Sequence, residues 1–350
     1  MKLFKYIIIF LVISLVSVYF LLQNHSVQNR LFENTVRGLF QADEIFMSDA
    51  LSVAVCGSRA PLPSPNRAET CLLVQAGTSK FIIDTGRGSA DNLQRWRVDY
   101  SDLEAVILSH LHSDHISDLH EVQFQSWLGG RKTPLSVIGP VGTASTTQGF
   151  EQAFELDSIY RSEHHGAILP IEAYGYDVVE FDGDSALIFQ NEDTSITAFK
   201  VDHSPVDPSY AFKIEYKDRS IVLSGDTISL EVMTEYSKGV DVLFHDALAL
   251  PLIQEMERIS KELGNDIVSK VLFDIQDYHA NTIEVADIAK KAEVDLLVFY
   301  HLIPAPVNYI SEQMFLRGVD EIFSNYHVSE DGTLVSLPAG SDEIFIDLID

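Results

Sequence analysis

The chain has 350 residues, 46% of them hydrophobic, which is enough to bury a sizeable core in one large domain or in two ordinary ones. Its 52 acidic residues outnumber its 24 basic residues and give a formal net charge of -28. Because affinity for a polyanion depends largely on Lys and Arg side chains that neutralise phosphates, this balance argues against a nucleic-acid partner.

The first predicted element is an uncharged apolar segment over residues 6–22, preceded by Lys2 and Lys5. The segment is short for a membrane span and long for the core of a signal peptide, and no small-residue cleavage site follows it. Because the positive charges lie on its N-terminal side, we expect residues 1–22 to anchor the protein in a membrane, with the remainder exported to the periplasm or the cell exterior. A cleaved signal peptide, which would release a secreted domain, is the alternative.

A polar stretch follows and ends in a short amphipathic element. Phe32, Val36, Leu39 and Phe40 recur there at helical spacing. We therefore interpret residues 23–48 as a linker between the membrane segment and a globular domain over residues 49–350.

The globular part begins with a sheet-like pattern, in which residues 51–56, 70–74 and 80–86 are the predicted strands. A Pro-rich loop separates the first two strands, and the only two cysteines, Cys56 and Cys71, flank it. A disulfide between neighbouring strands, which an exported protein allows, and two buried free thiols are equally good interpretations.

A dense group of polar side chains follows the next predicted strand, residues 105–108. In an extended segment alternate side chains share a face, so His110, His112 and Asp114 can converge, and His115 follows where a helical pattern begins. These are ligand types that zinc takes. A polar turn whose histidines only bond the backbone is the weaker alternative, because close imidazoles repel one another when protonated.

Strands and helices alternate in the rest of the chain, which predicts an α/β protein. Four apolar strands, residues 194–201, 219–224, 240–244 and 295–300, each lead to a His or an Asp. These residues are His203, Asp226, Asp246 and His301. Because strand ends can meet at one rim of a sheet, we expect a shared site. With Asp246 left aside, seven candidate ligands remain, and they suit two adjacent divalent metals bridged by a carboxylate and a hydroxide. The seven are His110, His112, Asp114, His115, His203, Asp226 and His301.

The order and spacing of these seven residues closely resemble the metallo-β-lactamase superfamily. Three further motifs resemble its ribonuclease Z and arylsulfatase branch. Asp84, in Ile-Ile-Asp-Thr-Gly, matches a strand-end Asp that supports the metal loop. The motif His-Asp-Ala-Leu around Asp246 is similar to a His-Glu-Ala-Thr motif, with Asp in place of Glu. The motif around His279 is similar to a His-Ser-Thr motif, and a predicted helix over residues 283–291 follows it.

The resemblance implies an αββα sandwich with two zinc ions at one edge, manganese or iron being the alternative metals. It implies that His110, His112 and His203 hold one ion, that Asp114, His115 and His301 hold the second, and that Asp226 bridges them. It further implies a metal-activated water as the nucleophile. Asp114, His279 and Asp246 form the implied catalytic group, in which Asp246 orients His279 as a proton donor.

The expected substrate follows from a departure from the family. Ribonuclease Z grips transfer RNA with a basic arm, but between Lys132 and Lys200 the only basic residue besides histidine is Arg161. We therefore expect a hydrolase of a small phosphodiester or sulfate ester, with nucleic acid excluded and a dimer as one oligomeric state. A ribonuclease Z-type 3′-tRNA processing enzyme and a non-catalytic metal-stabilised scaffold are the alternatives. The residues expected to contact a small substrate are Trp127, His164 and His165.

Overall fold

The computed structural model describes residues 2–39 and 45–349. The chain divides into two compact units, Met1–Asp43 and Glu44–Asp350. The first contains helices α1 (Lys2–Leu22) and α2 (His25–Leu39), so the predicted linker includes a helix. Phe40 of the predicted amphipathic pattern lies outside the described residues. Residues Leu3–Leu22 are long and apolar enough to cross a membrane, a test of length and composition that a signal sequence also passes.

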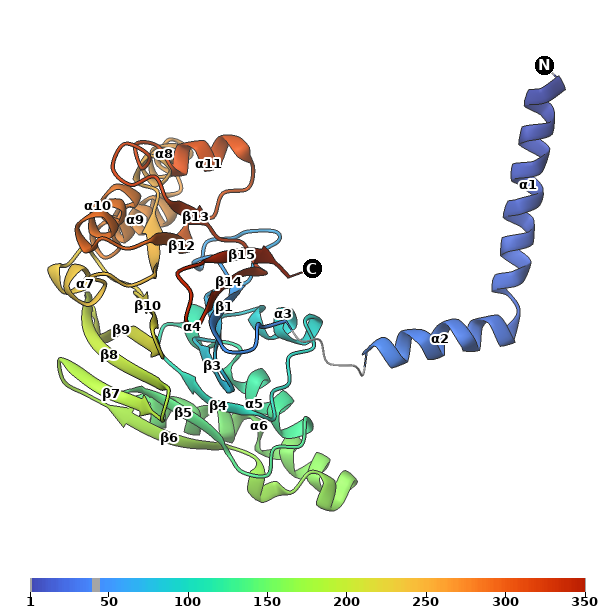
Figure 1. The fold of residues 1–350 in the computed structure, drawn as a ribbon, viewed down its shortest axis with the longest axis horizontal. Coiled ribbons are helices and arrows are strands. Elements are labelled where there is room, and N and C mark those ends of the chain that lie inside the picture. Colours follow the sequence, from blue (N-terminus) through green and yellow to red (C-terminus); the bar gives the residue numbers. More distant parts are fainter. Residues whose placement is uncertain (1, 40–44, 350) are drawn as a thin grey trace. The chain divides into compact units, whose positions relative to one another are not determined.

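The second unit is built on two sheets that face each other (Figure 1). The first sheet has the order β15-β14-β1-β2-β3-β4-β5-β6. Its strands are β1 (Ala50–Gly57), β2 (Cys71–Ala76), β3 (Ser79–Ile83), β4 (Leu103–Ile107), β5 (Leu135–Pro140), β6 (Tyr176–Phe181), β14 (Thr333–Pro338) and β15 (Phe345–Leu348). The second sheet has the order β13-β12-β11-β10-β9-β8-β7. Its strands are β7 (Ser185–Gln190), β8 (Thr194–His203), β9 (Val206–Tyr216), β10 (Arg219–Leu223), β11 (Val242–Leu248), β12 (Leu296–Ile303) and β13 (Tyr326–Val328).

The main core lies between the sheets, and strand alternation explains how it is filled. In β1 the side chains of Leu51, Val53 and Val55 point into the core between the sheets, whereas Ala54 and Cys56 join the cluster on the outer face of the first sheet. Because successive side chains of a strand point to opposite faces, a continuous apolar strand is buried on both sides. Both sheets therefore need a helical layer outside them.

Helices supply those two outer layers (Figure 1). The helices packed on the first sheet are α3 (Ser89–Arg95), α5 (Leu119–Leu128) and α6 (Thr143–His165). Those packed on the second sheet are α7 (Glu231–Tyr236), α10 (Thr282–Ala292) and α11 (Tyr309–Phe315). The remaining helices of this unit are α4 (Ser113–Ile116), α8 (Leu250–Glu262) and α9 (Asp266–Asp274). The predicted αββα sandwich is confirmed.

The Pro-rich loop between β1 and β2 is closed at its base by a disulfide between Cys56 and Cys71. Both cysteines are buried in the outer-face cluster of the first sheet. Of the two alternatives, a disulfide and two free thiols, the structure has the disulfide. The loop then reaches the second sheet, where Leu302 N–H donates to the carbonyl oxygen of Ser58 at 3.0 Å. The loop therefore links the first sheet to the end of β12.

Candidate metal centre and catalytic pair

The loop after β4 is held in place by one buried carboxylate at the end of β3. The backbone N–H and the hydroxyl of Ser109 donate to Asp84 at 2.8 and 2.7 Å. His115 Nδ1 lies 2.7 Å from the same carboxylate. When Nδ1–H donates to Asp84, Nε2 of His115 is left as a lone-pair donor, which is how a carboxylate usually orients a metal-binding histidine. Asp84 thus lies where a supporting residue was predicted.

The ends of β8, β10 and β12 bring three further side chains to this loop from the second sheet. These side chains are His203, Asp226 and His301. Asp226 lies in the middle of the group, and its Oδ2 atom is close to nitrogens of four histidines. The distances from Oδ2 to Nε2 are 3.3 Å for His115 and His301, 3.7 Å for His203 and 3.9 Å for His110. The carboxylate of Asp226 therefore lies where both sheets meet.

All seven predicted ligands fall into two groups around that carboxylate. The first group contains His110, His112, His203 and Asp226, and the second contains Asp114, His115 and His301, with the ligand atoms of each group within 4.8 Å of one another. Of the seven, only His112 is exposed. The structure thus brings together residues that lie up to 191 positions apart in the sequence, from 110 to 301.

Unpartnered buried atoms show that this donor set fits divalent cations. His110 Nε2, His115 Nε2 and Asp226 Oδ1 are buried and have no hydrogen-bond partner among the described residues. Leaving such atoms unpaired costs roughly 1–3 kcal/mol each, whereas a cation at the centre would satisfy them. Imidazole nitrogens and carboxylate oxygens are ligands of Zn²⁺, and they also bind Mn²⁺ and iron. The arrangement supports divalent metal binding.

The electrostatics of the group also favour metal ligation. Burial, together with the neighbouring His115, lowers the pKa of His110 well below its usual value, so this ring is neutral. Burial opposes ionisation of Asp226, but His301 and His115 hold the pKa of its carboxyl well below the usual range. Burial also disfavours a charged His115, yet Asp226 and Asp84 raise its pKa well above the usual value. The carboxylates thus require a positive partner here.

A second functional element, the pair His279–Asp246, borders the metal-ligand groups. His279 Nδ1 lies 2.8 Å from Asp246 Oδ2, and Asp246 is fully buried on β11. The N–H of Asp246 donates to the hydroxyl of Ser224 at 2.9 Å, which fixes its position. The shorter Asp side chain therefore reaches the histidine in place of Glu. Because His279 also forms a group with Asp226 and His301 within 4.8 Å, its ring faces the metal-ligand centre.

Sequence reasoning missed one contributor to this site, the backbone carbonyl of Tyr278. His203 Nδ1 lies 2.9 Å from that carbonyl oxygen, which leaves Nε2 of His203 directed at Asp226. The ring of Tyr278 also lies 5.2 Å from the ring of His203. A backbone acceptor has no sequence signature, and adjacency to His279 is the only signal that could have found it.

The three residues expected to contact a small substrate lie away from the metal ligands. Trp127 is buried, and its indole N–H donates to Pro170 O at 3.0 Å, so the ring belongs to the packing beneath α5 and is closed to a ligand. His164 and His165 are exposed at the end of α6.

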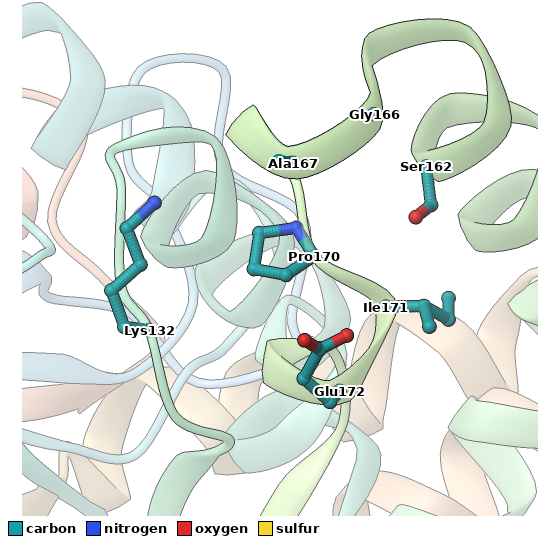
Figure 2. Close-up of a pocket in the computed structure, with 7 residues that line it drawn as sticks. All are labelled: Lys132, Ser162, Gly166, Ala167, Pro170, Ile171 and Glu172. Atoms are coloured by element: carbon teal, nitrogen blue, oxygen red, sulfur yellow. The ribbon is translucent and has the colours of Figure 1, made fainter.

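A surface pocket of about 490 Å³ lies beside this end of α6, with Lys132 on one side and Ser162 on the other (Figure 2). None of the residues that line it is one of the seven candidate metal ligands, and neither His164 nor His165 lines it. The pocket is therefore separate from the candidate metal centre.

Comparison with known proteins relates this geometry to a family. The model described as the Metallo-beta-lactamase superfamily matches residues 65–301. Ribonuclease Z of Mycobacterium bovis (strain BCG / Pasteur 1173P2) is 34% identical over 287 residues, covering 80% of this chain and 96% of that protein. Ribonuclease Z of Mycobacterium marinum is 34% identical over 261 residues, covering 73% of this chain and 87% of that protein.

Solved structures share the fold. The metallo-β-lactamase fold protein YhfI from Bacillus subtilis has a TM-score of 0.61 and 21% identity, covering 82% of this chain and 100% of that chain. Human tRNase Z, short form, has a TM-score of 0.57 and 20% identity, covering 82% of this chain and 99% of that chain.

These relatives contradict one expectation drawn from charge. The prediction that a nucleic-acid partner is excluded is wrong, because relatives 34% identical to this chain are named Ribonuclease Z. The prediction used the net charge of the whole chain and the scarcity of basic residues over one interval. Neither quantity measures the local field at a site where cations can bind, and phosphate is recognised by that local field.

Proposed function

Because the chain belongs to the metallo-β-lactamase superfamily and, within it, to the ribonuclease Z family, we propose that it is an endoribonuclease that removes 3′ extensions from transfer RNA precursors. As a member of this superfamily it is a metal-dependent hydrolase of ester bonds. The observation that carries the proposal is the convergence of six ligand side chains around a seventh, Asp226, next to the His279–Asp246 pair. This reading replaces the small phosphodiester or sulfate ester that the sequence favoured.

The chain's own residues have distinct functions in this proposal. His110, His112 and His203 would hold one cation, Asp114, His115 and His301 would hold a second, and the carboxylate of Asp226 would complete the donor set. When bound, such cations stabilise charge that develops on the phosphate and lower the pKa of a water molecule. We assign Zn²⁺ to both positions because three imidazoles are present in the first group and two in the second.

The His279–Asp246 pair supplies the proton in this mechanism. Water attacks phosphorus and releases a proton to solvent, the bond between phosphorus and the leaving oxygen breaks, and His279 gives a proton from Nε2 to that oxygen. Asp246 holds Nδ1–H of His279 and stabilises the ring in the orientation that directs Nε2 at the metal-ligand centre.

The test is hydrolysis by the purified, zinc-loaded full chain of three substrates. They are a transfer RNA precursor with a 3′ trailer, bis(p-nitrophenyl) phosphate and p-nitrophenyl sulfate. We expect cleavage of the precursor at the end of the acceptor stem and no turnover of the sulfate. Hydrolysis of the aryl phosphodiester with an intact precursor would instead establish a phosphodiesterase and refute the RNA-processing function. Turnover of neither phosphodiester would favour the scaffold alternative.

We also propose that α1 anchors the protein in a membrane and that the catalytic unit is exported. The length and composition of Leu3–Leu22 support the anchor. The disulfide between Cys56 and Cys71 supports export, because disulfides persist in oxidising compartments. The test is alkylation of intact cells followed by denaturation, which reports whether the two thiols are oxidised in place. Because transfer RNA precursors are made in the cytoplasm, export and RNA processing compete: oxidised thiols in intact cells would count against the RNA-processing proposal, whereas reduced, alkylatable thiols would contradict export.

A further inference from the structure

A cleft of about 450 Å³ opens beside the metal ligands on the side of the second sheet. His112 and His203 form the wall that the cleft shares with the first ligand group. Pro205 and Val206 extend this wall, and Asp277 and Tyr278 lie among the residues that line the rest of it. A ligand in this cleft would therefore touch the metal centre on one side.

Tyr278 supplies an aromatic surface at the base of the cleft. Its ring lies 5.2 Å from the ring of His203 and 5.0 Å from that of His279, so it borders both the ligand group and the proton donor. The ring is half-buried because one side packs on an apolar cluster that includes Leu248 and Ile303. Burial raises the pKa of the Tyr278 phenol, and Asp274 and Asp226 raise it further, so the group is a neutral hydrogen-bond donor.

The charged groups that line the cleft are carboxylates. Asp274 of α9 pairs with Lys270, one turn earlier on the same helix. Asp277 is exposed, and its side chain forms no ion pair or hydrogen bond with another described residue. No Lys or Arg lines the cleft in the described parts of the chain. Carboxylates repel phosphate, so the part of the cleft beside Asp274 and Asp277, away from the metal ligands, disfavours a phosphate. They accept hydrogen bonds from amino groups on the edges of nucleobases.

We propose that this cleft holds one unpaired nucleobase next to the scissile phosphodiester, between Tyr278 and the Pro205–Val206 wall, with Asp277 accepting hydrogen bonds from its Watson–Crick edge. The inference rests on the proposed RNA substrate and specifies which feature of that RNA the protein reads. Aromatic and apolar walls hold splayed-out bases of single-stranded RNA by stacking. Guanine is favoured most, because its N1–H and N2–H can both donate to one carboxylate, and uracil, which lacks an amino group, is favoured least.

The first test measures binding without turnover. The zinc-loaded full chain is titrated calorimetrically with guanosine 5′-monophosphate, uridine 5′-monophosphate and ribose 5-phosphate, which has no base. One well-formed base contact discriminates by roughly 1–3 kcal/mol, so we expect guanosine monophosphate to bind about 10-fold or more tightly than ribose 5-phosphate. Asp277→Asn should remove most of the preference for guanine over uracil. Equal affinity of all three ligands for the wild-type chain would overturn the subsite.

The matched control is Asp193→Asn, the same substitution at an exposed position in the turn between β7 and β8. It should leave all three affinities unchanged, because Asp193 does not line the cleft. Since Asp277 is exposed and makes no side-chain contact, its substitution should not unfold the chain, and a melting temperature equal to that of the wild type verifies this. A loss of guanine preference in the control variant as well would contradict a specific role of Asp277.

The second test separates the subsite from the proposed function. On RNA precursors that differ only in the bases next to the cleavage site, Asp277→Asn should raise KM for amino-bearing bases and leave kcat nearly unchanged. The Asp193→Asn control should hydrolyse every precursor with the KM and kcat of the wild type, because Asp193 does not line the cleft. Cleavage of RNA with unaltered base preference in the variant would refute the subsite alone. Base-dependent binding of nucleotides by a chain that leaves precursors intact would refute the RNA-processing function alone.

Discussion

Substitution of His279, which contacts Asp246, should lower activity without lowering metal content, unlike substitution of a metal ligand. His279→Ala removes a proton donor at the edge of the centre, so kcat should fall by about 10²–10⁴-fold. The metal content should stay at the wild-type level, because the seven candidate ligands are intact. Metal analysis after gel filtration and steady-state kinetics measure the two effects. His164→Ala, an exposed histidine of α6, is the control and should change neither quantity. Loss of metal in proportion to activity would assign His279 to ligation instead.

Asp226 is the residue whose removal should affect the metal centre most. Its Oδ2 atom lies within 3.9 Å of nitrogens from both ligand groups, so Asp226→Ala removes a donor from both at once. We expect bound metal to fall below one ion per chain and activity to be abolished. His112→Ala removes the exposed ligand of one group and should spare the other ion. Equal metal content in the two variants, measured by elemental analysis, would show that Asp226 does not lie between two ions.

The candidate ligands could be found in the sequence because each follows an apolar strand, and strand ends collect at a rim. Tyr278 could not, because its contribution to orienting His203 is a carbonyl oxygen that every residue carries. Asp277 could not either, because one more carboxylate in an acidic chain gives no signal until the fold places it in a cleft.

At the level of elements, the turn after β3 leaves no room for a side chain at Gly86. A Cβ atom there would lie 2.2 Å from the carbonyl oxygen of Asp114 and 2.6 Å from the carbonyl carbon of Glu69. Both are backbone atoms, so Gly86→Ala must displace the loop after β4, which carries four predicted ligands. We expect a loss of about 1–3 kcal/mol in the free energy of unfolding, together with weaker metal binding. Urea denaturation and competition with a chelator measure these effects.

Gly149 provides the matched control for that substitution. It lies within α6, and a Cβ atom there would meet nothing within 4 Å. Gly149→Ala should therefore stabilise the chain by about 0.5–1 kcal/mol, since alanine loses less conformational entropy in a helix. A destabilising effect of the same size at both positions would contradict the steric explanation for Gly86.

The disulfide closes the loop that connects the first sheet to the end of β12. Replacing both cysteines (Cys56→Ala with Cys71→Ala) releases a loop with a sequence separation of 15, which is expected to lower stability by about 3 kcal/mol. Thermal unfolding of the variant should match that of the wild-type chain treated with a dithiol reductant. An unchanged melting temperature in either sample would contradict a stabilising role for the bridge.

The strands could be predicted where they form apolar runs and where strands alternate with helices along the chain. β1, β10 and β12 lie close to their predicted positions because buried strands give continuous apolar runs. β9 (Val206–Tyr216) was missed, because Pro208 and charged residues interrupt its pattern, and tertiary pairing with β8 and β10 decides its conformation. The helix predicted over residues 283–291 is α10, which extends over Thr282–Ala292.

On the scale of the whole molecule, the division into two compact units predicts that residues 1–43 attach the protein to a membrane and that the second unit is active without them. The catalytic residues and their supporting contacts all lie within Glu44–Asp350. Deletion of residues 1–43 should therefore move the protein from the membrane fraction to the soluble fraction and keep kcat within about twofold, because no contact of the site is lost. Fractionation followed by hydrolysis of bis(p-nitrophenyl) phosphate checks both statements. A soluble full-length chain would contradict the anchor proposed for α1.

Whole-chain charge was the weakest guide to function. A net charge of -28 predicts solubility and long-range repulsion of polyanions, but it says little about a rim where carboxylates and imidazoles can gather cations. The family was recognisable from the spacing of a few ligands, whereas the substrate depends on surfaces that the fold assembles. The local environment of the site therefore decides the partner.

The contribution of β12 to the centre has a consequence for biosynthesis. The donor set opens with His110 but is completed by His301, which belongs to the second sheet. While the ribosome is still translating the codons before 301, the nascent polypeptide lacks a ligand and part of the surface on which the others converge. A protein with this arrangement emerges from the ribosome with its hydrolytic chemistry still unformed, and a message broken upstream of that codon yields a product with an incomplete ligand set.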